Sequence, residues 1–174
     1  TSNICTAQAL LAIVSAAYAV YHGPQGIKKI AESVSQLTKN FADKLKQSGY
    51  ELYSNDFFDT VTIKTLDKTE KIYKNALDQG VNIRKVNSEM LAVSFDERKN
   101  LYRANQLLKI FNCSETIKES MNESLSNIPK NLLRTSTYLD HPVFNSYHSE
   151  TEMLRYLKKL EDSDIALNLS LIHI

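Results

Sequence analysis

The stretch Val81-Asn-Ile-Arg-Lys-Val-Asn-Ser-Glu-Met-Leu-Ala-Val-Ser-Phe95 decides the fold, because it holds two short strand patterns separated by a turn. Residues 81–86 and 90–95 are rich in apolar and β-branched side chains, which favour strands. The tripeptide Asn87-Ser-Glu89 between them is typical of a turn. The stretch therefore predicts two short strands of a small sheet.

Further strand and helix patterns lie on both sides of this stretch. Residues 57–63 are aromatic and β-branched and predict another strand. Residues 69–79 have helical periodicity, and Gly80 ends that helix. After the sheet, Asp96 is expected to cap a helix whose inner face carries five apolar residues. These are Leu101, Ala104, Leu107, Leu108 and Phe111.

The chain opens with two predicted helices separated by a Gly-Pro dipeptide. Residues 1–3 offer capping side chains for a helix that runs to about His22. Gly23-Pro24 breaks this helix and starts the next one, which Gly49 ends. The second helix carries one apolar stripe at spacings of three and four. Its members are Ile27, Ile30, Val34, Leu37, Phe41 and Leu45.

Residues 7–21 are almost wholly apolar, interrupted by Gln8 and Ser15. This run is shorter than the ~18–20 residues that a membrane span needs. Ala17-Tyr-Ala19 resembles a signal-peptidase site, but no basic segment precedes the apolar run. We therefore expect a buried helix, with no membrane or targeting role.

The order helix, helix, strand, helix, strand, strand, helix predicts an α+β fold, in which helices cover a small antiparallel or mixed sheet. A linker and a last helix follow. We predict a helix-sheet domain over 1–128, a linker over 129–148, an amphipathic helix over 149–168 and an anomalous tail over 169–174.

The composition excludes several classes of protein. A net charge of +1 and interspersed charges give no general attraction to nucleic acid or to an anionic membrane. Two cysteines are too few for a disulfide-stapled domain. Four scattered glycines form no phosphate-binding loop. We expect a globular domain that binds neither nucleic acid nor membrane.

Residues 141–150 are unusually rich in functional side chains, namely His141, Asn145, His148 and Glu150. The spacing of the two histidines matches no common metal motif, so no metal site is predicted. Hydrogen bonds that fix the linker are the favoured role. Lining a binding pocket is the alternative.

Ser149 and Glu152 form the S-x-x-E pattern of a capping box, and they predict the start of the last helix. Its apolar face is expected to consist of Met153, Tyr156, Leu157 and Leu160. Cys5 falls in the first turn of the first helix, where a thiol's pKa is lowered, so it is either a reactive thiol or a small buried side chain. The sixteen lysines have no Schiff-base surroundings and are expected at the surface.

Several segments together resemble one enzyme family, the P-proteins of the glycine cleavage system, which are decarboxylating glycine dehydrogenases. The similar segments are residues 1–12, Tyr18-Ala-Val-Tyr-His-Gly-Pro24, Phe57-Phe-Asp-Thr60, Val93-Ser-Phe-Asp-Glu97 and His141–Glu161 continuing into Asp164-Ile165. After Asn168 the chain departs from the family pattern, and no function is assigned to residues 169–174. Enzymes of the family are several times longer than this chain.

The resemblance implies a pyridoxal-phosphate enzyme of the aspartate-aminotransferase fold class, built as two similar halves. It implies decarboxylation of glycine and transfer of the aminomethyl group to the lipoyl arm of the H-protein. This chain resembles the small domain of the N-terminal half. The cofactor-binding lysine belongs to the second half, so we expect no catalytic residue and no bound cofactor here.

The resemblance also sets expectations for partners and compartment. Residues 135–161 are expected to dock onto the missing half, with His141, Asn145, His148 and Glu150 near the substrate pocket. The full-length enzyme is expected to be a homodimer. It is expected in the cytoplasm of a bacterium, which the excess of lysine over arginine favours, or in the mitochondrial matrix of a eukaryote. The alternative is a free-standing interaction module that uses the helix over 149–162.

Overall fold

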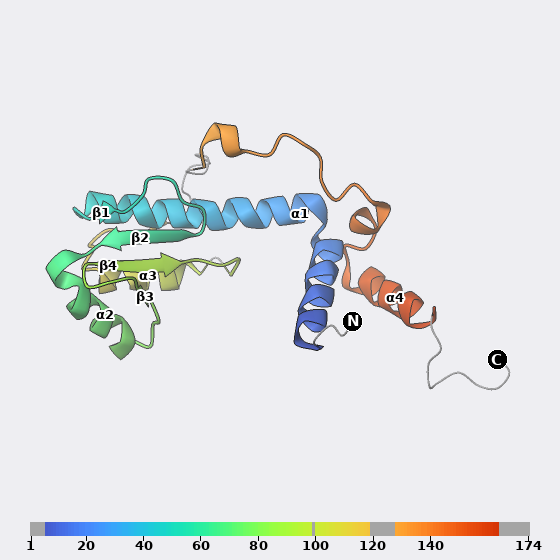
Figure 1. The fold of residues 1–174 in the computed structure, drawn as a ribbon, viewed down its shortest axis with the longest axis horizontal. Helices are drawn as coiled ribbons and strands as arrows, with labels where there is room; N and C mark the ends of the chain where they lie inside the picture. The colour runs from blue at the N-terminus through green and yellow to red at the C-terminus, as the bar shows by residue number, and fades with distance from the viewer. Residues whose placement is uncertain (1–5, 99, 119–127, 164–174) are drawn as a thin grey trace, which may run out of the picture. The chain divides into compact units, whose positions relative to one another are not determined.

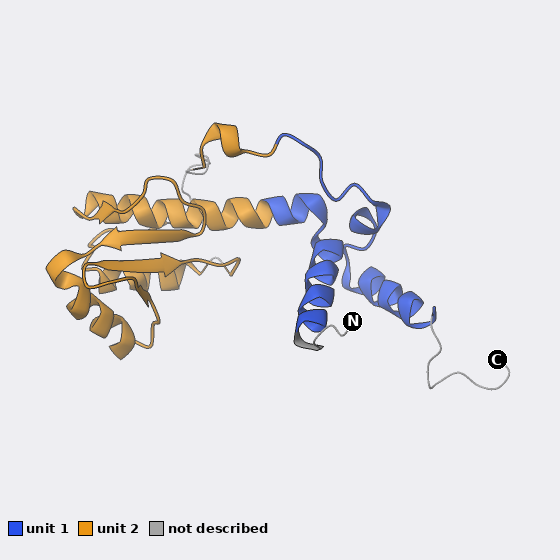
Figure 2. Cartoon of the chain, in the orientation of Figure 1, with its two compact units in different colours: residues 1–28, 135–174 blue, residues 29–134 orange. Residues whose placement is uncertain are grey.

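The computed structural model describes residues 6–98, 100–118 and 128–163, and it groups the chain into two compact units. Unit 1 combines the N-terminal residues up to Lys28 with the C-terminal part from Thr135 (Figure 2). Unit 2 runs from Lys29 to Arg134. The four-part division predicted from the sequence stays a prediction.

Helix α1 spans Thr6–Gln47 and breaks at Gly23, where the backbone has φ 61° and ψ 179°. Pro24 follows as the first residue of the second helical segment, a position that needs no backbone N–H. Gly49, with φ 87°, lies just beyond the C-terminal end. The predicted break, restart and stop are therefore confirmed.

Unit 2 is built on an antiparallel four-stranded sheet of order β1-β2-β4-β3 (Figure 1). The strands are β1 (Glu51–Leu52), β2 (Thr60–Lys64), β3 (Arg84–Lys85) and β4 (Met90–Ser94). In the central pair Val61 lies opposite Val93 and Ile63 opposite Leu91. These four side chains share one face of the sheet, because side chains alternate along a strand.

Helices cover that face and complete a single core. They are α2 (Thr69–Asp78), α3 (Leu101–Ile110) and the second segment of α1. Side chains that are fully buried in this core include Phe41, Leu45, Val61, Ile63, Ile72, Leu91, Leu108, Ile110 and Phe111. The α+β fold with helices over a small sheet is confirmed, and the sheet is antiparallel.

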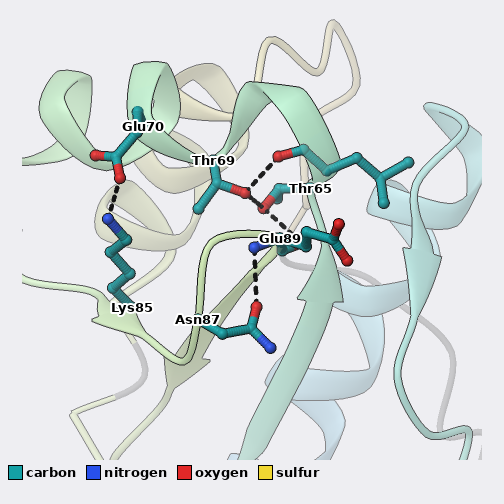
Figure 3. A network of polar contacts seen from close by, with 7 residues as sticks. Thr65, Thr69, Glu70, Lys85, Asn87 and Glu89 are labelled. Atoms are coloured by element: carbon teal, nitrogen blue, oxygen red, sulfur yellow. Dashed lines mark hydrogen bonds and ion pairs between the residues drawn. The ribbon is translucent and has the colours of Figure 1, made fainter.

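A buried polar network ties the turn before β4 to the start of α2 (Figure 3). The backbone carbonyl of Glu89 accepts hydrogen bonds from the N–H groups of Thr65, at 2.8 Å, and Leu66, at 3.0 Å. The Thr65 and Thr69 hydroxyls lie 2.7 Å apart. Because these buried hydroxyls have hydrogen-bond partners, their burial does not carry the free-energy cost of an unpaired polar group. Lys85 and Glu70 add an ion pair at the edge of the same network.

Several local predictions in unit 2 need correction. The strand expected at 57–63 begins only at Thr60, and the strand expected at 81–86 is reduced to β3, Arg84–Lys85. Strand β1 was not predicted, because two residues give no periodic pattern. Asn100, and not Asp96, caps α3: its side chain accepts from the Arg103 N–H at 3.1 Å. Asp96 instead accepts from the Arg98 N–H in the preceding turn.

Unit 1 holds the first segment of α1, the short helix η3 (Pro142–Asn145) and α4 (Glu150–Glu161). No helix in the described part of the chain is long and apolar enough to cross a membrane. The spacing of Ile117, Met121 and Leu125 suggests one more short helix, which falls mostly outside the described residues.

The predicted burial of two apolar helix faces is wrong for this chain. In the first segment of α1 the large apolar side chains are more than half exposed: Leu10 60%, Leu11 67%, Ile13 65% and Val14 54%. In α4, Leu157 and Leu160 of the predicted face are exposed, as is the neighbouring Leu154, whereas Met153 and Tyr156 are half-buried. Both helices are present, with α4 ending at Glu161, and the Tyr147 ring stacks on the Tyr156 ring with 4.4 Å between centroids.

Candidate functional site at the helix break

Two segments that lie far apart in the sequence meet within unit 1. One is the helix break, Tyr21–Pro24, where α1 changes direction. The other is the arm, residues 135–148, which leads to α4. The helix break and the arm from His141 onward belong to the segments that carried the family resemblance, so the place where they meet is the candidate functional site.

His148 makes the central contact of this site. Its Nδ1 lies 2.9 Å from the backbone carbonyl oxygen of Tyr21. A carbonyl oxygen only accepts, so Nδ1 carries the proton and donates. Carbonyls near a helix end lack intrahelical partners, and His148 therefore satisfies one of them at the break. In the neutral ring this leaves Nε2 as an acceptor on a side chain that is exposed.

Tyr138 holds the other side of the break, because its hydroxyl donates to the Pro24 carbonyl at 2.6 Å. Between these two contacts the arm approaches Gly23 closely. A Cβ at Gly23 would lie 2.7 Å from His148 Cε1 and 2.7 Å from the Phe144 carbonyl oxygen. Glycine is therefore required at position 23 for two reasons: the backbone has a positive φ, and the arm leaves no space for a side chain.

Hydrogen bonds inside the arm preserve its shape. His141 caps η3 by accepting from the Val143 N–H at Nδ1, over 3.2 Å. The Asn145 amide donates to the carbonyls of Leu139, at 3.0 Å, and His141, at 3.2 Å. Leu139 has a φ of 54°, so the arm contains a left-handed residue that these contacts hold in place.

Aromatic rings line the helical side of the break. The His22 ring lies 4.3 Å from the Tyr18 ring and 5.2 Å from the Tyr21 ring, between ring centroids. Tyr18 and Tyr21 remain partly exposed. The site thus combines the imidazoles of His22 and His148 with the phenols of Tyr18, Tyr21 and Tyr138 around a bent backbone. It is suited to hydrogen bonding and to packing against planar groups.

The arm continues directly into the capping box of α4. Ser149 Oγ accepts from the Glu152 N–H at 3.3 Å, and the Glu152 carboxylate accepts from the Ser149 N–H at 3.1 Å. The same carboxylate accepts from the His148 N–H at 3.2 Å. Hydrogen bonds from the Ser149 side chain and backbone, and then from His148, lower the pKa of Glu152. The predicted capping box is confirmed.

The remaining predicted site residues lie apart from the break. Glu150 is exposed in the first turn of α4. Cys5 lies outside the described residues. Cys113 is buried in unit 2, and burial raises the pKa of its thiol, which keeps it protonated and unreactive. Among the described side chains, no three His, Cys, Asp or Glu residues gather as a metal site would require.

The described lysines do not fit a site for pyridoxal phosphate. Such a site needs a lysine held in a pocket beside a group that binds the phosphate. Every lysine in the described ranges is exposed or half-buried. Among the half-buried ones, Lys39 is paired with Asp43 and Lys44 with Glu115. No reaction step through that cofactor can therefore be built from these residues.

Sequence reasoning missed Gly23 and Tyr138 as parts of the site. Gly23 was interpreted only as a helix breaker, although a Gly-Pro pair between two helices also permits close approach of another segment. No local sequence pattern marks Tyr138 as part of the site, because its hydrogen-bond partner is a backbone carbonyl 114 residues away in the chain.

Comparison with known proteins gives a consistent result. Residues 1–111 match the family model described as the glycine cleavage system P-protein. The chain is 98% identical, over 172 residues, to glycine dehydrogenase (decarboxylating) from Pelagibacter ubique (strain HTCC1062). It is 48% identical, over 178 residues, to the protein of that name from Photobacterium profundum. Each alignment covers 99% of this chain but 18% of the relative.

Proposed function

The chain belongs to the glycine cleavage system P-protein family, and we propose that it is a structural segment of a decarboxylating glycine dehydrogenase. The whole enzyme would decarboxylate glycine and pass the aminomethyl group to the lipoyl arm of the H-protein. The 98% identity to a relative of that name carries the proposal. That relative is more than five times as long as the aligned region, since the alignment covers 18% of it, which favours a segment over a free-standing interaction module.

The role of this segment is architectural. Unit 2 has its own core, so it serves as a folded domain. The arm and α4 dock onto the catalytic half of the enzyme. Two observations support docking: α4 exposes Leu154, Leu157 and Leu160 on one stripe, and the arm is fixed to the helix break by His148 and Tyr138. A fixed arm reduces the entropy lost on docking.

Four residues of this segment approach the substrate pocket of the whole enzyme: His141, Asn145, His148 and Glu150. For His141 and Asn145 the hydrogen bonds within the arm support a positioning role. His148 and Glu150 have exposed side chains, and His148 keeps Nε2 available to accept a hydrogen bond. These two are therefore the stronger candidates for direct contact with another part of the enzyme.

The whole enzyme takes pyridoxal phosphate as its cofactor, which supplies an electron sink for decarboxylation when bound. Its Schiff-base lysine lies outside this chain. The enzyme functions as a homodimer in the bacterial cytoplasm, and the matches to proteins from Pelagibacter and Photobacterium support a bacterial origin.

The test uses the full-length Pelagibacter relative with substitutions given in the numbering of this chain. We expect His148→Ala to lower the rate of glycine decarboxylation with lipoylated H-protein. We expect Lys64→Ala, a change at an exposed residue of unit 2, to leave that rate unchanged. The thermal unfolding midpoint of each variant is measured alongside. If His148→Ala changes neither the rate nor the midpoint, the role given to His148 is wrong.

A further inference from the structure

The first segment of α1 combines two properties that are unusual for a helix in contact with water. Residues 1–27 contain no Asp, Glu, Lys or Arg. In the helical part, the large apolar side chains are exposed from Leu10 to Val14, and Tyr18 and Tyr21 continue the same surface. A helix on the surface of a domain ordinarily carries a charged face opposite its apolar stripe.

The width of the apolar surface indicates what kind of neighbour it needs. At 100° per residue, the exposed side chains from Ile13 through Leu10 to Leu11 span an arc of about 160° around the helix axis. The rest of the circumference carries alanines, Gln8, Ser15 and His22, together with Val20, which is already buried. A helix without a charged face is typical of the interior of a large protein.

We infer that the first segment of α1 is an internal helix of the full-length enzyme, enclosed by polypeptide of the same molecule that lies outside this chain. The relatives contain the additional polypeptide that could enclose this helix, because this chain spans only 18% of their length. The inference rests on the proposed function only in taking the rest of the family's polypeptide as the covering material.

A lipid surface is a poorer occupant on the same observations. Helices that lie in a membrane interface carry Lys and Arg on the polar face, where they meet anionic head groups. This segment has none up to Lys28.

Hydroxyl-radical footprinting with peptide-resolved mass spectrometry tests the inference without any substitution. The 174-residue chain and the full-length Pelagibacter relative are oxidised under identical conditions, and Tyr53 and Tyr102 of unit 2 serve as exposed references. We expect oxidation of residues 10–18 to fall roughly tenfold in the full-length protein, as for a side chain moved into a close-packed interior. The references should change much less.

Three outcomes would overturn the inference. The first is equal oxidation of residues 10–18 in both proteins. The second is protection that disappears when the full-length protein is diluted to monomers, which would assign the helix to a second copy. The third is protection that appears only when vesicles of anionic phospholipid are added. Decarboxylation of glycine is measured separately, so failure of the proposed function is distinguishable from failure of this inference.

Discussion

At the scale of single residues, the bend of α1 and the position of the arm depend on Gly23 and His148. Gly23 has a combination of φ and ψ that only glycine adopts readily, and the arm fills the space where a side chain would stand. His148 then donates to a carbonyl that the bend leaves available. The bend and the arm therefore depend on each other.

Replacing Gly23 should release the arm. For Gly23→Ala we expect a loss of about 2 kcal/mol in local stability, because backbone strain adds to overlap with His148 and Phe144. Hydrogen exchange at the Val143 and Phe144 amides should then accelerate roughly thirty-fold. Gly49→Ala is the matched control, because Gly49 has a positive φ but no atom close to a new Cβ. Equal exchange rates at the Val143 and Phe144 amides in the two variants would show that the position of the arm does not depend on Gly23.

At the scale of elements, α4 should respond to acid through Glu152. Hydrogen bonds lower the pKa of this carboxyl in the folded state. The contribution of Glu152 to stability is therefore present above its ordinary pKa of 4.5 and is lost as the pH falls through the lowered value. We expect hydrogen exchange in the first turn of α4 to accelerate, relative to that of α2, as the pH is lowered below 4.5.

Glu152→Gln provides the control, because glutamine keeps the capping geometry without a titrating group. The acid response of α4 should be absent in this variant. An unchanged acid response would mean that another group governs the start of α4.

The cap of α3 gives a second test at this scale. Asn100→Ala should destabilise unit 2 by about 1 kcal/mol, the usual cost of losing a helix N-cap. Asp96→Ala should cost clearly less, because Asp96 bonds only within the preceding turn. Urea denaturation followed by tyrosine fluorescence measures both. A larger loss of unfolding free energy for Asp96→Ala than for Asn100→Ala would indicate that Asp96 caps α3, as the sequence predicts.

The elements that the sequence predicted well are those governed by local rules. The break at Gly23, the stop at Gly49 and the capping box at Ser149 each depend on residues within one helical turn. Burial of Leu11 or Leu157 depends on what lies opposite, and the sequence does not specify that. The contact between His148 and Tyr21 joins residues 127 positions apart, so no local pattern reveals it.

At the scale of the whole molecule, the two units differ in how far their apolar side chains are buried. Unit 2 encloses a core of its own, with Phe41, Phe111 and Leu108 fully buried. Unit 1 leaves large apolar side chains exposed on the first segment of α1 and on α4. We therefore expect cooperative urea unfolding to report on unit 2, and amides of unit 1 to exchange well before that transition. Exchange of both units at one common rate would contradict this division.

The central claim is that this chain is a non-catalytic segment of a P-protein, with the cofactor-binding lysine elsewhere. Pyridoxal phosphate binding tests it most directly. The purified 174-residue chain and the full-length Pelagibacter relative are incubated with the cofactor, passed through gel filtration and examined for the absorbance of a lysine imine.

We predict a stoichiometric imine in the full-length protein and none in this chain. A yellow chain that retains one equivalent of cofactor, and loses it on substitution of a single lysine such as Lys44→Arg, would contradict the account. Lys44 is the sharpest choice, because its side chain is only 15% exposed.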